Sequence, residues 1–141
     1  MMNLDLIRDR VDLIHKSIAR LEKLAALGEE EFQANADNYA IAEHHLRRAL
    51  ESVFDIGRHI MAKKGLGHPV DYRSILATLG QQGILPPPFT ERIRNMAGYR
   101  NRLVHGYAEV TPQELHILIK TRLEDFQEFC RYILKYIESQ F

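Results

Sequence analysis

Residues 96–107 read Met-Ala-Gly-Tyr-Arg-Asn-Arg-Leu-Val-His-Gly-Tyr, and we interpret the rest of the chain as a scaffold for this stretch. Apolar residues recur here at helical spacing, but Arg100 falls inside the apolar stripe. Because a guanidinium is rarely buried without a partner, we expect Arg100 to face a cleft or an interface. Gly106 suits the left-handed conformation that ends many helices, which places His105 in the last turn and Tyr107 just beyond it.

Two interpretations of this helix end remain open. In the functional one, Arg100, His105 and Tyr107 gather a cation, an imidazole and a phenol at one site. In the structural one, they are an arginine paired with a carboxylate, a histidine that caps the helix and a packed tyrosine. Spacing alone favours the structural interpretation, because ion pairs of purely structural importance are common.

The composition is that of one ordinary domain spanning residues 1–141, with 45% hydrophobic residues to form a core. Nineteen basic residues balance nineteen acidic ones, so any contact with RNA has to come from a local patch. Cys130 is the only cysteine, which excludes an intrachain disulfide and fits a reducing compartment. Early charged residues argue against a signal peptide, and no apolar run approaches the roughly 20 residues that span a bilayer. We therefore expect a cytoplasmic protein without membrane contact.

The apolar spacing predicts an all-α antiparallel bundle of four to five helices. The first helix has a narrow apolar seam and ends near Gly28; core packing explains this seam better than pairing with a second copy. The second helix starts or breaks at Asp37 and runs to about Lys63. The remaining helices are expected from Asp71 to Gly80, from about Phe89 to His105, and from Thr111 toward the C-terminal end, with Arg122 interrupting the last apolar stripe.

Local signals mark two of the boundaries. The run Pro86-Pro87-Pro88 predicts a stiff turn before the helix that carries the motif, because three proline rings restrict the backbone. Thr111-Pro112-Gln113-Glu114 predicts a helix start, with Thr as the N-cap, Pro at the first position and Glu three residues after the cap.

The polar face of the second helix carries Asp55 and His59, one turn apart. They are either a solvated Asp–His pair, which is the simpler interpretation, or polar residues that line the same cleft as Arg100. His44 and His45 are adjacent and so point to different faces of the helix, which argues against a metal-binding pair.

Residues 99–107, Tyr-Arg-Asn-Arg-Leu-Val-His-Gly-Tyr, resemble the signature of HEPN-domain ribonucleases and most closely that of HepT toxins. The HepT motif runs Arg, a polar residue, any residue, Leu, Val, His, any residue, Tyr, and every position is matched here. The similarity extends to residues 55–60 and 71–73. It implies a HEPN-type homodimer in which two copies of the motif share one cleft and cleave RNA.

The motif suits RNA cleavage because an RNA strand carries its own nucleophile, the ribose 2′-hydroxyl beside each phosphate. A histidine can move the proton and an arginine can hold the charge that develops on phosphorus, roles that fit His105 and Arg100. Asn101 would orient a phosphate oxygen or His105, and Arg102 would add positive potential unless it is a surface charge. The sequence contains no Cys-x-x-Cys or His-Glu-x-x-His motif and no carboxylate cluster at ligand spacing, so we expect cleavage without a metal or cofactor.

The resemblance also implies a regulator. In HepT systems, which are type VII toxin–antitoxin systems, a partner nucleotidyltransferase of the MntA type loads AMP onto the tyrosine that matches Tyr107. Each AMP would bring a phosphate and a base into the cationic cleft and block RNA. Two alternatives are a non-catalytic helical nucleotide-binding module that partners a nucleotidyltransferase, and a purely structural dimerisation bundle. The intact motif favours the enzyme.

Overall fold

A computed structural model describes residues 2–105 and 109–140, and every regular element within these ranges is a helix. The all-α prediction is confirmed, although the described residues form more helices than the four to five expected. The helices are α1 (Leu4–Ala25), α2 (Glu29–Ala34), α3 (Ala36–Lys63), α4 (Tyr72–Gln81), α5 (Pro87–Ile93), α6 (Asn95–His105), α7 (Pro112–Thr121) and α8 (Leu123–Ser139).

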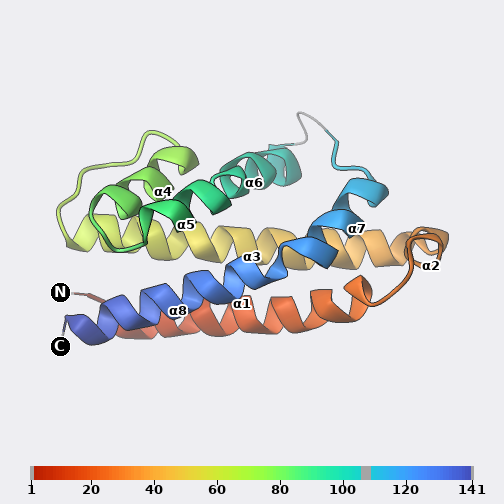
Figure 1. The fold of residues 1–141 in the computed structure, drawn as a ribbon, viewed down its shortest axis with the longest axis horizontal. Coiled ribbons are helices and arrows are strands. Elements are labelled where there is room, and N and C mark those ends of the chain that lie inside the picture. Colours follow the sequence, from red (N-terminus) through yellow and green to blue (C-terminus); the bar gives the residue numbers. More distant parts are fainter. Residues whose placement is uncertain (1, 106–108, 141) are drawn as a thin grey trace.

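The two long helices α1 and α3 run antiparallel along the length of the molecule and form its most extensive helix contact (Figure 1). On one side of this pair, α8 lies along α1. On the other side, α4 and α6 pack against α3, with α5 between them in the chain. The motif helix α6 therefore rests on the middle helix of the bundle, and its C-terminal end lies toward α7.

The apolar seam of α1 is buried within the domain, as the periodicity predicted. Its buried residues are Ile7, Val11, Ile14, Ile18 and Leu21, and they belong to one hydrophobic core cluster shared with α3, α7 and α8. Their packing against α3 leaves this seam unavailable to a second copy of the chain. None of the described helices is long and apolar enough to cross a membrane.

The capping signals largely hold. Asp71 caps α4 and forms a capping box with Ser74, and the Thr111 hydroxyl accepts the backbone N–H of Glu114 at 3.1 Å to begin α7. The start of α3 was misplaced: Asn35 is its N-cap, with its side chain accepting the backbone N–H of Asp37 at 2.9 Å.

Two predicted long helices are each broken in two. The motif helix expected from Phe89 to His105 is α5 followed by α6, and the final helix is interrupted at Arg122. At the second break, Asp125 is buried and its carboxylate accepts from two guanidinium groups, Arg122 Nε at 3.1 Å and Arg92 Nε at 2.6 Å. This ion-pair cluster joins the end of α5 to the start of α8.

Candidate active site

The C-terminal half of α6 brings Arg100 and His105 together. Arg100 Nη1 lies 3.4 Å from His105 Nε2, a long hydrogen bond in which the guanidinium donates. A guanidinium has no acceptor atom, so this contact requires His105 Nε2 to be unprotonated. Arg100 is half-buried and His105 is exposed. The two residues singled out in the sequence are therefore neighbours within one copy of the chain.

Arg100 does not form the structural ion pair that was one of its two interpretations. Among the described residues, no carboxylate lies within ion-pair distance of its guanidinium, and its buried Nε has no hydrogen-bond partner there. Its guanidinium carbon instead lies 4.1 Å from the centroid of the Tyr72 ring, in a cation–π contact. Part of the donor set of Arg100 is thus unused within the described chain.

Tyr72 is a contact of Arg100 that sequence reasoning missed. It is the first residue of α4, and its position depends on how closely α4 approaches α3. Gly57 permits this approach, since a Cβ atom there would lie only 2.5 Å from Ile75 Cγ2. The ring is then supported by Phe54, whose ring lies edge-on to it with centroids 5.0 Å apart. The similarity of residues 55–60 and 71–73 to HepT sequences was the only signal for this contact.

Asp55 and His59 do not form the expected Asp–His pair. Asp55 Oδ2 accepts a hydrogen bond from Arg10 Nε at 3.0 Å, and His59 Nε2 accepts the backbone N–H of Asn3 at 3.0 Å. Burial and the nearby Lys63 lower the pKa of His59, which favours the neutral ring that this hydrogen bond requires. Both side chains therefore bind residues of α1 and its N-cap rather than residues of α6.

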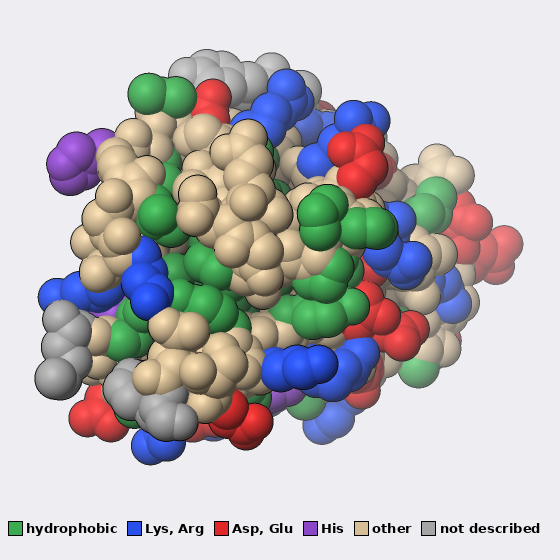
Figure 2. All heavy atoms as spheres, turned by 60° about the vertical axis from the view of Figure 1, so that its left-hand side comes forward, with side chains coloured by type: hydrophobic (Ala, Val, Ile, Leu, Met, Phe, Trp, Pro, Cys, Tyr) green, Lys and Arg blue, Asp and Glu red, His purple; other side chains and the backbone are tan. Residues whose placement is uncertain are grey.

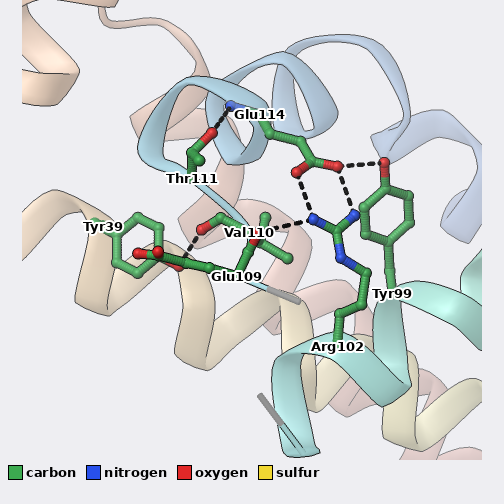
Figure 3. A network of polar contacts seen from close by, with 7 residues as sticks. All are labelled: Tyr39, Tyr99, Arg102, Glu109, Val110, Thr111 and Glu114. Atoms are coloured by element: carbon green, nitrogen blue, oxygen red, sulfur yellow. Dashed lines mark hydrogen bonds and ion pairs between the residues drawn. The ribbon is translucent and has the colours of Figure 1, made fainter. Parts of the chain in front are cut away.

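Arg102 forms an ion pair instead of adding uncompensated positive charge to the site. Its Nη1 and Nη2 atoms donate to the two carboxylate oxygens of Glu114, each at 2.7 Å, in the bidentate geometry favoured by arginine (Figure 3). Tyr99 Oη donates to the same carboxylate at 2.9 Å, and Arg102 Nη2 also donates to the carbonyl of Glu109 at 2.8 Å. We call the side chains of Tyr99, Arg102 and Glu114 the clamp.

Within the clamp, the pKa values of Glu114 and Tyr99 are shifted in opposite directions. Hydrogen bonding to Arg102 holds the pKa of Glu114 below its usual value, and this outweighs the opposing effect of burial. Burial, together with Glu114, raises the pKa of Tyr99. The clamp therefore contains a charged carboxylate and a neutral phenol at neutral pH, which suits the donor and acceptor roles seen in Figure 3.

The clamp fixes the chain on both sides of residues 106–108. Arg102 lies on α6 before this segment, whereas Glu109 and Glu114 follow it. Tyr39 of α3 adds a second attachment, because its hydroxyl donates to the carbonyl of Val110 (Figure 3). Gly106, expected to end the helix, and Tyr107, the expected AMP acceptor, lie outside the described residues.

Asn101 is half-buried on α6 next to Arg100. A cavity of about 230 Å³ lies between α3, α6, α7 and α8. Tyr99 lines this cavity, but Arg100 and His105 do not, so the cavity is separate from the Arg100–His105 pair. On the face shown in Figure 2, hydrophobic side chains gather near the centre, and side chains of both charges lie mainly around them.

The helical fold of the described residues matches that of a solved HEPN toxin, so the chain has a HEPN-type helical domain. Residues 14–133 match the family model described as "Ribonuclease HepT-like", and the chain belongs to this family.

Individual relatives agree with the family match over nearly the whole chain. The tRNA nuclease HepT of Aphanizomenon flos-aquae is 27% identical over 132 residues, which cover 94% of this chain and 90% of that protein. The mRNA nuclease HepT of Shewanella oneidensis is 27% identical over 125 residues, covering 89% and 93%. A solved structure of the tri-AMPylated Shewanella oneidensis HEPN toxin in complex with its MNT antitoxin superposes with a TM-score of 0.85 at 28% identity, covering 95% of this chain and 99% of that chain.

Proposed function

We propose that the protein is a metal-independent endoribonuclease toxin of a type VII toxin–antitoxin system, with Arg100 and His105 as its catalytic residues. The observation that carries this proposal is the 3.4 Å contact between the Arg100 guanidinium and the His105 imidazole, on an arginine that no described carboxylate neutralises. The names of its relatives, a tRNA nuclease and an mRNA nuclease, support RNA as the substrate class.

The proposed reaction uses only groups of the RNA and of the chain. The 2′-oxygen attacks the adjacent phosphorus, the bond to the 5′-oxygen breaks, and a 2′,3′-cyclic phosphate and a 5′-hydroxyl result. His105 carries a proton in this exchange, because histidine changes its protonation near neutral pH. Arg100 holds the phosphate oxygens and stabilises the charge that develops on them, and Asn101 orients one of these oxygens or His105.

Each turnover moves two protons, one from the 2′-hydroxyl and one to the leaving 5′-oxygen. One copy of the motif supplies a single His105. A homodimer that places two copies in one cleft would supply an imidazole for each transfer, as the family resemblance implies. The half-buried Arg100 would then contact RNA in a groove shared by the two copies.

Regulation would come from a nucleotidyltransferase antitoxin of the MntA type. The solved relatives include a toxin carrying three AMP groups in complex with its antitoxin and a toxin–antitoxin complex with AMP-PNP. We assign Tyr107 as the acceptor, two residues after His105. AMP attached there would put a phosphate near Arg100 and occupy the position of the RNA phosphate. Mass spectrometry of the protein coexpressed with its antitoxin should show AMP additions that Tyr107→Phe abolishes.

The decisive experiment measures cleavage of labelled tRNA and mRNA by purified protein with an added chelator. Cleavage should persist in chelator and fall at least 100-fold in Arg100→Ala and His105→Ala, consistent with the roughly 10²–10⁴-fold contribution of a general acid or base. Arg94→Ala is the control, because Arg94 is exposed and pairs only locally with Glu91 at 2.9 Å. Full activity in both site variants would overturn the assignment. Nucleotide binding without cleavage by the wild type would favour a non-catalytic module.

A further inference from the structure

A second arginine shares the Tyr72 ring with Arg100. The guanidinium carbon of Arg58, on α3, lies 5.5 Å from the ring centroid, and that of Arg100, on α6, lies 4.1 Å from it. Since these distances add to 9.6 Å, the two guanidinium carbons are no farther apart than that. Two cations from different helices are therefore held near each other by one aromatic ring.

The position of the ring is determined by backbone features rather than by the arginines. Asp71 accepts the backbone N–H of Ser74 at 2.8 Å and so fixes the first turn of α4, of which Tyr72 is the first residue. The absence of a side chain at Gly57 lets Ile75 of α4 approach α3 next to Arg58. The ring is thus a contact shared by the two guanidinium groups, held in place by the packing of α4 on α3.

The charge of Arg58 is only weakly compensated. Its Nη1 atom lies 3.9 Å from Asp55 Oδ1, at the limit of an ion pair, whereas Arg10 Nε binds the other oxygen of Asp55 at 3.0 Å. The Arg58 side chain is 49% exposed, which leaves its donors accessible to a ligand. Two like charges gathered at one ring favour an anionic ligand that contacts both.

We propose that Arg58 forms a second phosphate-binding subsite, which takes the phosphodiester next to the one held by Arg100 on the same RNA strand. Tyr72 is the positioning residue that sets the spacing between the two subsites. This inference rests on the proposed function, because RNA is the ligand. The distance between neighbouring phosphorus atoms of one strand is shorter than the upper limit of 9.6 Å on the separation of the two guanidinium carbons. The second contact would fix the register of the strand and thereby place the scissile phosphate at Arg100.

The test measures binding of a single-stranded oligoribonucleotide by fluorescence anisotropy at several salt concentrations. The parent protein is the full chain with His105→Ala, so that RNA is bound but not cleaved. Each phosphate contact contributes about 0.7 to the slope of log affinity against log salt concentration for a single strand. Arg58→Ala should therefore lower the slope by about 0.7 and weaken binding roughly tenfold, whereas Arg58→Lys should keep the slope.

Arg131→Ala is the matched control. Arg131 also pairs with a carboxylate one turn away, Glu128 at 3.8 Å, and is 63% exposed, but it lies on α8. Its removal should leave the slope unchanged. At Tyr72 itself, Tyr72→Phe keeps the aromatic ring and should bind RNA like the parent. Tyr72→Leu should bind RNA more weakly while circular dichroism still shows a cooperative thermal unfolding transition.

The outcomes separate the two proposals. If Arg100→Ala lowers the salt slope but Arg58→Ala leaves it at the parent value, the second subsite is wrong and the proposed function stands. If the parent does not bind RNA at all, both are overturned. Equal losses for Arg58→Ala and Arg131→Ala would also reject the subsite, because the effect would then reflect general surface charge.

Discussion

Replacing Glu114 by Gln should destabilise the fold by about 2 kcal/mol, because hydrogen bonds to charged groups contribute roughly 1.5–3 kcal/mol. The change keeps the size of the side chain but removes its charge and replaces one acceptor oxygen with an NH₂ group. It therefore disrupts the bidentate contact with Arg102, formed at 2.7 Å through both oxygens. The side chains of Arg102 and Glu114 are 28% and 31% exposed, so solvent screens this pair only in part.

A loss of this size is easily measured. Urea unfolding followed by circular dichroism gives the free energy directly, and Tm should fall by roughly 6–10 °C for a domain of this length. The matched control is Glu91→Gln, which removes an ion pair of similar length, 2.9 Å to Arg94, from side chains that are 65% and 69% exposed. The control should cost no more than about 0.5 kcal/mol. Equal, small losses in the two variants would show that the contact between Glu114 and Arg102 contributes no more to stability than an exposed ion pair.

Three further predictions concern pH, reactivity and packing. The pKa of Glu114 is lower in the folded state than its ordinary value of 4.5. The stabilisation from the charged carboxylate is therefore complete above pH 4.5 and is lost as the pH falls through the lower, folded pKa. Urea unfolding at several pH values should show the free energies of unfolding of the wild type and Glu114→Gln converging in acid. Burial raises the pKa of Cys130 to about 12, so iodoacetamide at pH 8 should label this thiol only as the chain unfolds, and rapid labelling of folded protein would contradict its burial. Gly57→Ala should cost roughly 1–3 kcal/mol by thermal melting, because the new methyl would meet Ile75, and a neutral effect would show that α4 can move away freely.

Periodicity and caps were enough to predict the main helices. The apolar seam of α1 and the capping residues Asp71 and Thr111 are signals within a few residues of the boundaries that they mark. The end of α3 at Lys63 was predicted in the same way. These features depend on local backbone chemistry, which the sequence displays directly.

The ion pairs at the break before α8 join distant residues and could not be predicted. The buried carboxylate of Asp125 binds Arg92, which is 33 residues away, and this contact accompanies the break before α8. Helix α2 was also missed, because its one buried residue, Phe32, stacks on His116 from α7 with ring centroids 4.7 Å apart. A six-residue helix has too little periodicity of its own to be recognised.

At the candidate site too, the residues on a single helix were predicted, and the contacts between helices were not. Arg100 and His105 were identified because both lie on one helix at a spacing that their motif defines. The partner of Arg102 was missed, since Glu114 lies 12 residues further along the chain on another helix and had been assigned only a role at the helix start. Tyr72 was missed because it meets Arg100 only through the packing of α4 on α3.

The chemical ends of the RNA fragments show whether the ribose 2′-oxygen is the nucleophile and whether Arg100 and His105 are needed for its attack. Purified protein, with chelator present, should leave 2′,3′-cyclic phosphate or 3′-phosphate ends together with 5′-hydroxyl ends, identified by mass spectrometry of the fragments. These ends should disappear in both Arg100→Ala and His105→Ala. Fragments with 3′-hydroxyl and 5′-phosphate ends would contradict attack by the 2′-oxygen, and unchanged cleavage in the two variants would contradict the Arg100–His105 site itself.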